Sequence, residues 1–154
     1  METALSVNGK VFSVVKMLGK GNGGYSYLVK DGIGRYVLKQ IHQELCDNAP
    51  FDSRIEEEIK DYMKLKSIGV KMPAMLDIDT KEERILKEYI EGQTIYELML
   101  RDKIEPSYLK QIQQMCALLH EAAPHMECFP TQFVVRDKEI YYVDFECNDY
   151  LEKG

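Results

Sequence analysis

A glycine-rich segment between two strand-like runs constrains the fold of this chain more than any other feature of the sequence. The glycines of residues 19–24 are preceded by apolar and β-branched residues at 11–18 and followed by a similar run at 25–30. A dinucleotide-binding fingerprint needs a helix directly after the glycines, and Tyr25 onward is a poor helix start. The sequence therefore predicts a β-hairpin in which Gly19, Gly21 and Gly24 let the backbone approach phosphate groups closely. A flexible Gly-rich turn is the alternative.

The N-terminal part of the chain predicts an antiparallel sheet and one helix. Asn8-Gly9 between apolar residues is typical of a type I′ hairpin turn, and further strands are expected over 35–41, 74–79 and 84–89. Residues 51–67 have helical spacing, with Ser53 and Glu56 as a capping box and Gly69 just after the end.

The C-terminal part predicts helices followed by one late hairpin. Helices are expected over 94–101 and over 106–123, with Pro106 in a first turn and Leu109, Ile112, Cys116 and Leu119 at helical spacing. The hairpin is expected over 133–143. Strands first and helices later favour an α+β fold with two lobes, residues 1–91 as the N-lobe and 92–154 as a minimal C-lobe.

Lys39 and Glu58 are candidate partners in an ion pair. Lys39 lies in an otherwise apolar strand, where a buried ammonium needs a carboxylate. At about 100° per residue, Glu58 falls within the apolar arc of the helix, which is formed by Ile55, Ile59, Tyr62, Met63 and Leu65. A glutamate on a buried face calls for a cation, so we predict that Glu58 pairs with Lys39. The alternative is a solvent-facing Lys39 and a Glu58 at the rim of a narrower apolar stripe.

Three further side chains near the C-terminus are suited to metal and proton chemistry. Asp144 follows a strand-like run at the point where a strand opens into a turn, and a carboxylate there suits a hard cation. In the stretch 125–132, between a helix and a strand, Glu127 could accept a proton and the Gln132 carbonyl could ligate magnesium.

From about Val11 to Phe145 the chain resembles the protein-kinase superfamily. The resemblance is closest to small atypical and prokaryotic members, such as RIO kinases and the kinase of the KEOPS tRNA-modification complex. The glycine segment resembles the phosphate-covering loop, Lys39 the strand lysine and Glu58 the helix glutamate, while Asp144 and Phe145 resemble the metal-binding Asp-Phe pair. Residues 88–92 resemble the hinge, which implies adenine contacts at Glu88 and Ile90. The resemblance implies a two-lobed fold that binds ATP and Mg²⁺, with Gln132 and Asp144 as metal ligands.

The chain also departs from the pattern of that superfamily. The catalytic-loop aspartate and asparagine are replaced by Glu127 and Gln132, each one methylene longer, and a misplacement of about 1 Å can cost about a hundredfold in rate. Glu146 stands where the glycine after Asp-Phe is expected. Only ten residues follow Asp144. We therefore expect either a truncated chain or a minimal C-lobe, and in the second case a partner protein that completes the fold.

Three classes of function remain open from the sequence. The first is an ATP-dependent phosphotransferase, a Ser/Thr protein kinase or a partner-stimulated ATPase, with Lys39, Glu58, Glu127 and Asp144 as catalytic residues. The alternative is a catalytically impaired pseudokinase that acts as a nucleotide-binding regulatory or interaction module, which Glu127, Gln132 and Glu146 favour. A small-molecule kinase is least favoured, because such enzymes need a large helical substrate lobe.

Composition narrows the expected partners and compartment. The net charge of -6 argues against general binding to nucleic acid or anionic membranes. The N-terminus lacks a signal-peptide core, and no apolar run approaches the roughly 18 residues of a membrane span. The four cysteines form no Cys-x-x-Cys pair and are interpreted as buried free thiols. We therefore expect a cytoplasmic protein whose partners are ATP and a protein substrate or activating protein.

Overall fold

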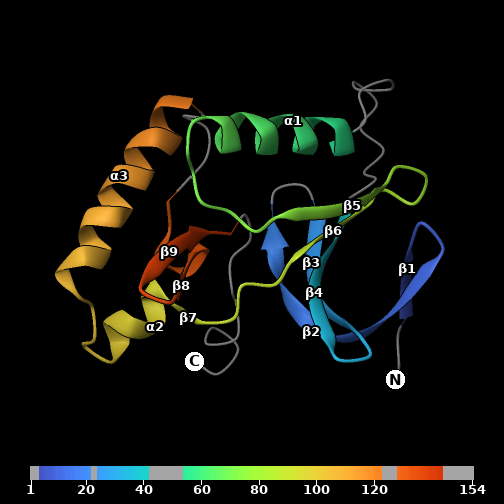
Figure 1. Cartoon of the computed structure of the whole chain (residues 1–154), viewed down its shortest axis with the longest axis horizontal. Helices are drawn as coiled ribbons and strands as arrows, with labels where there is room; N and C mark the ends of the chain where they lie inside the picture. Colours follow the sequence, from blue (N-terminus) through green and yellow to red (C-terminus); the bar gives the residue numbers. More distant parts are fainter. Residues whose placement is uncertain (1–3, 22–23, 42–53, 123–127, 144–154) are drawn as a thin grey trace. The chain divides into compact units, whose positions relative to one another are not determined.

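The structure is a computed structural model that describes residues 4–21, 24–41, 54–122 and 128–143 (Figure 1). The chain divides into two compact units. The first comprises 1–61 with 74–89, and the second comprises 62–73 with 90–154. The sequence predicted a boundary at residue 91, with the helix expected over 51–67 entirely in the N-lobe. That boundary stays a prediction.

The first unit is built on a six-stranded antiparallel sheet with the strand order β1-β2-β3-β4-β6-β5. The strands are β1 (Ala4–Val7), β2 (Lys10–Gly21), β3 (Gly24–Asp31), β4 (Gly34–Ile41), β5 (Met75–Asp79) and β6 (Arg84–Glu88). The turn between β1 and β2 has positive φ angles at Asn8 (50°) and Gly9 (87°). This is the geometry that the Asn-Gly pair predicts for a type I′ turn, so the expected hairpin is confirmed.

Hydrogen bonds join the two edges of this sheet. The Asn8 backbone N–H donates to Asp79 Oδ2 at 2.7 Å, and Asn8 Nδ2 donates to Asp77 Oδ1 at 2.8 Å. Arg84 Nη1 also donates to the Ser6 carbonyl at 2.9 Å. Because β1 and β5 are the first and last strands of the sheet, these bonds show that the sheet curls until its edges meet. Edge strands that lie against each other are less exposed to pairing with another chain.

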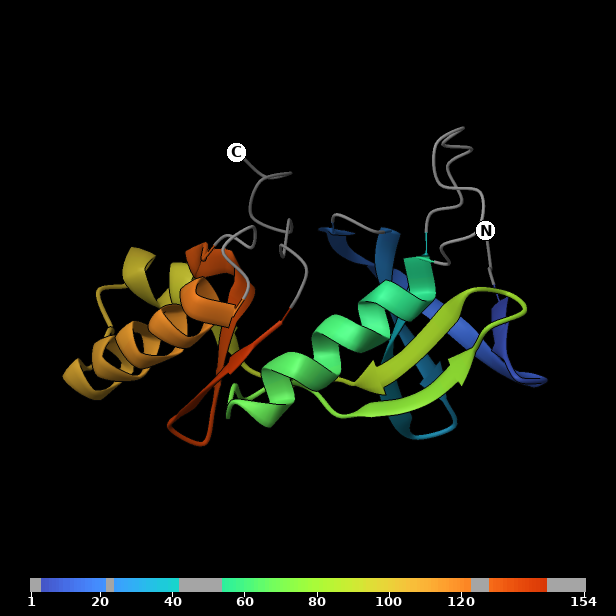
Figure 2. The same cartoon turned by 90° about the horizontal axis from the view of Figure 1, so that it is seen from above.

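Helix α1 (Arg54–Ser67) packs on the first sheet and ends in a Schellman motif. Figures 1 and 2 show the start of α1 lying over the strands of this sheet. Ile55 in its first turn is buried with Ile41 and Ile85 of the sheet. At its end, Gly69 N–H donates to the Lys66 carbonyl and Val70 N–H to the Leu65 carbonyl, both at 3.1 Å. Gly69 has a φ of 97°, which explains why a glycine follows the helix.

The apolar face of α1 is narrower than the sequence suggests. Ile55, Tyr62 and Leu65 are buried, but the predicted core residue Met63 is 59% exposed. At about 100° per residue, the three buried positions span about 80°, the half-buried Ile59 extends this arc to about 120°, and Met63 lies about 40° beyond Ile59. The expectation that Met63 faces the core is therefore wrong, whereas Glu58 lies within the narrower arc.

The second unit combines a three-stranded antiparallel sheet, ordered β7-β8-β9, with two helices. Its elements are β7 (Gln93–Thr94), α2 (Ile95–Leu100), α3 (Pro106–Ala122), a 3₁₀ turn η1 (Pro130–Gln132), β8 (Phe133–Arg136) and β9 (Glu139–Tyr142). Thr94 caps α2, because its Oγ1 accepts from Glu97 N–H at 3.1 Å and Glu97 Oε1 accepts from Thr94 N–H at 2.9 Å. The short elements β7 and η1 were not predicted.

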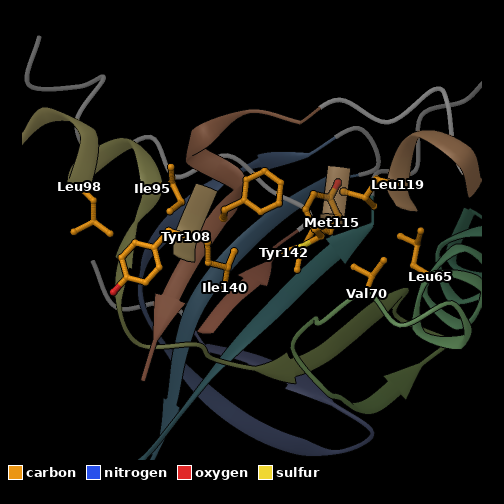
Figure 3. Packing of buried hydrophobic residues seen from close by; sticks show 10 residues of the cluster. Leu65, Val70, Ile95, Leu98, Tyr108, Met115, Leu119, Ile140 and Tyr142 are labelled. Atoms are coloured by element: carbon orange, nitrogen blue, oxygen red, sulfur yellow. The ribbon is translucent and has the colours of Figure 1, made fainter. Parts of the chain in front are cut away.

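The core of the second unit lies between its helices, its sheet and the segment from Leu65 to Val70 (Figure 3). It buries Leu65, Val70, Ile95, Leu98, Tyr108, Met115, Leu119, Phe133, Ile140 and Tyr142. Helix α3 contributes Tyr108, Met115 and Leu119, whereas Leu109 is 52% exposed. The expected inward position of Leu109 is wrong, because the buried stripe starts one residue earlier. The α+β class, with an antiparallel N-terminal sheet and few helices, is confirmed.

Candidate functional site

Lys39 and Glu58 form an ion pair inside the first unit. Lys39 Nζ lies 2.8 Å from Glu58 Oε2, and the side chains are 3% and 18% exposed. Lys39 sits in the middle of β4, with Ser26 and Ile85 as its register partners on the neighbouring strands. A charge-assisted hydrogen bond at this burial compensates two groups that would be costly to desolvate alone. The predicted pairing of Lys39 with Glu58 is therefore present in the structure.

A second lysine, which sequence reasoning missed, lies near the same carboxylate. Lys87 Nζ of β6 is 3.6 Å from Glu58 Oε2, and the Lys87 side chain is 7% exposed. Lys87 pairs in register with Val37, two positions from Lys39 along β4. A signal existed in the sequence, because Lys87 follows Ile85 and Leu86 as Lys39 follows Val37 and Leu38.

The glycine-rich segment forms the predicted hairpin. Strands β2 and β3 pair antiparallel, with Gly19 opposite Ser26 and Gly21 opposite Gly24. The residues between Gly21 and Gly24 lie outside the described part of the chain. Gly24 lies on β3, the strand that neighbours β4 and Lys39, while Gly19 and Gly21 lie on β2, one strand further away. Their role in holding phosphate stays a prediction.

Gly24 also has a structural reason to be glycine. A Cβ atom at this position would lie 1.9 Å from the Gln40 carbonyl oxygen and 3.0 Å from Ile41 Cα. These atoms belong to the backbone of β4 and cannot rotate away as a side chain would. The close approach of β3 to β4 therefore excludes any side chain at Gly24, whatever the ligand.

Ser26 buries a hydroxyl group beside this ion pair. Its side chain is 1% exposed, and its register partners are Lys39 on β4 and Gly19 on β2. Ser26 Oγ has no hydrogen-bond partner among the residues that the structure describes. Buried polar groups are normally hydrogen-bonded, so a buried hydroxyl without a partner among the described residues is unusual.

The predicted hinge residues Glu88 and Ile90 are described at the end of β6 and after it. Glu88 N–H donates to the Ala74 carbonyl at 2.8 Å, and Ala74 N–H donates to Glu88 Oε1 at 3.1 Å. These bonds attach the end of β6 to the residue before β5. Ile90 is 4% exposed. Contacts of Glu88 and Ile90 with adenine stay predictions.

Gln132, a predicted metal ligand, is held in the turn η1. Its Oε1 accepts from Phe129 N–H at 3.0 Å, and its own carbonyl accepts from Val143 N–H at 2.7 Å. The residue directly before Asp144 is thus bonded to Gln132. Asp144, the other predicted ligand, and Glu127, the predicted proton acceptor, lie outside the described residues. Within the described ranges, no group of three or more acidic, histidine or cysteine side chains is arranged to hold a metal ion.

The cysteines of the described part are free thiols. Cys116 is half-buried, while Cys128 is exposed, which corrects the expectation that both are buried; Cys46 and Cys147 lie outside the described residues. Burial, and then a hydrogen bond with Cys128, raises the pKa of Cys116 to about 12. Cys116 is therefore protonated at neutral pH and a poor nucleophile.

No helix of the described ranges combines the length and the apolar character needed to span a bilayer.

Comparison with known proteins supports the kinase resemblance. The chain is 29% identical over 134 residues to the KEOPS complex subunit Bud32 of Pyrococcus abyssi, over 83% of the chain and 61% of that protein. It is 29% identical over 112 residues to a probable serine/threonine-protein kinase BUD32 homolog of Archaeoglobus fulgidus, over 72% of the chain and 51% of that protein. The chain is similar to Bud32-type atypical protein kinases. The predicted resemblance to the KEOPS-type kinases is thereby confirmed.

A longer relative contains a similar region. The chain is 26% identical over 109 residues to a probable bifunctional tRNA threonylcarbamoyladenosine biosynthesis protein of Methanocaldococcus jannaschii, over 71% of the chain and 20% of that protein. No protein-family model matches the chain. The chain spans 61% and 51% of the length of the first two Bud32-type relatives. The similarity to the Bud32-type relatives thus extends over most of this chain but only part of those proteins.

Proposed function

We propose that this chain binds Mg-ATP and transfers the γ-phosphate of ATP, as a Ser/Thr protein kinase or a partner-stimulated ATPase. The observation that carries the proposal is the buried ion pair between Lys39 and Glu58 beside the glycine hairpin. Lys39 lies on the strand next to the glycine-rich hairpin, and Glu58 of α1 holds its ammonium group in place. An ammonium group held in this way is suited to bind the phosphates of a nucleotide. The similarity to Bud32-type kinases supports the same site.

Each residue of the site has a proposed role. Lys39 Nζ would hold the phosphates as a point charge, and Glu58 would keep Lys39 in place. The backbone N–H groups of the glycine hairpin would cover the phosphates. Gln132 and Asp144 would hold Mg²⁺, and Glu127 would orient the attacking hydroxyl or water. ATP supplies the phosphoryl group, and Mg²⁺ neutralises its charge.

The second candidate is a catalytically impaired pseudokinase. Glu127 and Gln132 each carry one methylene more than the kinase pattern, and Glu146 adds a negative charge beside Asp144. This protein would bind the nucleotide through Lys39 and Glu58 without transferring the phosphate efficiently. A P. abyssi relative is named as a subunit of the KEOPS complex, so we propose that this chain also acts with a protein partner.

Nucleotide binding is tested before catalysis. We expect ATP with Mg²⁺ to raise the thermal unfolding midpoint of the wild type, because a ligand that binds only the folded state stabilises it. Lys39→Ala should remove this shift, whereas the same change at the exposed Lys30 of β3 should retain it. An unchanged midpoint for the wild type at millimolar ATP would exclude the site.

Transfer of labelled γ-phosphate separates the two candidates. The kinase predicts transfer, or ATP hydrolysis with a partner, that Asp144→Ala abolishes. If the chain is a pseudokinase, it should bind ATP, but neither the wild type nor Asp144→Ala should transfer the labelled phosphate. Adding a stimulating partner should not change this result. Activity that survives Asp144→Ala would contradict the proposed metal site.

A further inference from the structure

Ser26 carries a buried hydroxyl group whose bonding capacity is unused within the described part of the chain. Its side chain is 1% exposed, and Ser26 Oγ has no hydrogen-bond partner among the described residues. Such a hydroxyl lowers stability, because it has lost its bonds to water without gaining others. An alanine would occupy nearly the same space without this cost, so the serine calls for a role outside the unliganded fold.

The register of the sheet places this hydroxyl on the face that carries the buried ion pair. Ser26 on β3 pairs with Lys39 on β4, and side chains paired in this way project from the same face. Lys39 extends from that face to Glu58 of α1. On its other side Ser26 pairs with Gly19 of β2, which adds no side chain. In the order of the strands, Ser26 thus stands between the buried lysine and the first glycine of the hairpin.

Strand β2 is irregular at the point where it reaches Ser26. Its pairing with β3 shifts register between Val14 and Lys16, and again between Met17 and Gly19. Such bulges bend a strand and increase its twist, and they are frequent beside functional sites. The second shift comes directly before Gly19, so the regular pairing of the two strands is interrupted next to the buried hydroxyl.

We propose that Ser26 is a nucleotide-binding residue whose hydroxyl donates a hydrogen bond to the nucleotide held by Lys39 and the glycine hairpin. This inference rests on the proposed function of the site. Lys39 keeps its bond to Glu58 in the complex, and Ser26 adds a separate contact from the neighbouring strand. A nucleotide presents acceptor atoms in its phosphates, its ribose and its base, and a serine hydroxyl donates to each kind.

The burial of Ser26 makes this hydrogen bond favourable for binding. A solvent-exposed hydroxyl must give up its bonds to water before it binds a ligand, whereas Ser26 Oγ is already desolvated in the unliganded chain. The nucleotide therefore gains the hydrogen bond without further desolvation of the protein group. The same hydroxyl should reduce the stability of the free protein and increase its affinity for the nucleotide.

Substitution by alanine tests both effects in one variant. Ser26→Ala should raise the thermal unfolding midpoint of the unliganded chain and weaken ATP binding about tenfold in titration calorimetry, as expected for the loss of one well-formed hydrogen bond. Ser13→Ala is the matched control, because Ser13 lies on β2 outside the glycine segment and pairs with Ala4 and Lys30. This variant should bind ATP as the wild type does.

Two variants of equal shape separate the hydroxyl from the size of the side chain. Threonine and valine add the same bulk at position 26, but only threonine keeps a hydroxyl. Ser26→Thr should therefore bind ATP about tenfold more tightly than Ser26→Val. Equal ATP affinities in these two variants would show that the hydroxyl does not contact the nucleotide, and would overturn the proposal.

Titration with adenosine locates the acceptor atom on the nucleotide. If Ser26→Ala weakens the binding of adenosine as much as that of ATP, the hydroxyl donates to the base or the ribose. If only the binding of ATP is weakened, the hydroxyl donates to a phosphate. Both results support the proposal, because each identifies a contact of Ser26 with the bound nucleotide.

Other outcomes separate this inference from the proposed function. A lower unfolding midpoint together with weaker ATP binding in Ser26→Ala would make Ser26 a structural residue and would overturn the inference. Wild-type ATP affinity in Ser26→Ala, together with weak binding in Lys39→Ala, would also overturn it but leave the proposed function in place. A wild type that binds no ATP would overturn both.

Discussion

At the scale of the residue, we expect Ser26 to lower the free energy of unfolding of the unliganded chain. Its hydroxyl is buried and lacks a hydrogen-bond partner among the described residues. Ser26→Ala should therefore increase the free energy of unfolding by about 1 kcal/mol, because it removes a desolvated polar atom. Urea unfolding measures this change. Ser67 is the control, since its Oγ donates to the Lys64 carbonyl at 2.7 Å, and Ser67→Ala should reduce stability slightly.

Gly24 carries a second prediction at this scale. Gly24→Ala places a Cβ atom 1.9 Å from the Gln40 carbonyl oxygen, so the backbones of β3 and β4 must separate. We expect a loss of about 3 kcal/mol in the free energy of unfolding, at the upper end for overpacked sites. Gly32→Ala meets no atom within 4 Å, and its φ of 61° alone should cost about 1 kcal/mol. Equal losses in the two variants would contradict this account.

At the scale of the element, the side chain of Asp79 at the end of β5 holds the β1–β2 turn, because it accepts a hydrogen bond from the Asn8 N–H. Hydrogen bonds from the N–H groups of Asn8 and then Glu82 lower the pKa of Asp79 below its ordinary value of 3.8. A lowered folded-state pKa contributes stability above the unfolded-state pKa, and this is lost as pH falls through the folded-state value. Asp79→Asn should therefore destabilise the fold at pH 7, by a difference that begins to shrink below about pH 4 and is lost once the pH falls below the lowered folded-state pKa of Asp79.

Urea unfolding at several pH values measures this prediction. Asp61→Asn, the same substitution at an exposed position of α1, is the control and should change stability little at any pH. A destabilisation by Asp79→Asn that is the same at pH 3 and pH 7 would show that the charge of Asp79 does not contribute. The wild type should also lose stability as pH falls through the region where Asp79 is protonated.

At the scale of the whole molecule, helix α1 supplies residues to both cores. Ile55 lies in a core of the first unit, and Leu65 lies in the core of the second. A helix that unfolds loses both contributions together, so we expect the two units to unfold in one transition. Leu119→Ala in the second core should lower the unfolding free energy by about 3 kcal/mol. In Leu119→Ala, the backbone amides in the strands of the first unit should also show reduced protection from hydrogen exchange. Separate unfolding transitions for the two units would contradict this expectation.

Local signals predicted most of the elements. Asn8-Gly9, Gly69 and Pro106 each act on neighbouring backbone groups, so their effects could be inferred from adjacent residues. The side chains that were placed incorrectly, such as Met63, occupy the edges of helical faces. There a rotation of one residue decides burial, and helical spacing alone does not fix which edge the neighbouring elements cover.

The candidate site was predicted in part, through residues whose burial is unusual for their type. Lys39 and Glu58 each needed an opposite charge, and desolvation made their pairing a physical requirement rather than a pattern match. Lys87 has the same kind of strand environment but was overlooked, because only the sheet register brings β6 next to β4 and Glu58.

By itself, the sequence of this protein determined the hairpins, the helix ends and the requirement for a cation beside Glu58, since turn chemistry and charge burial act locally. The tertiary structure decided the meeting of the sheet edges at Asn8 and Asp79, the crowding at Gly24 and the approach of Lys87 to Glu58. These contacts join residues far apart in the chain, and they form only when the curled sheet and α1 pack together.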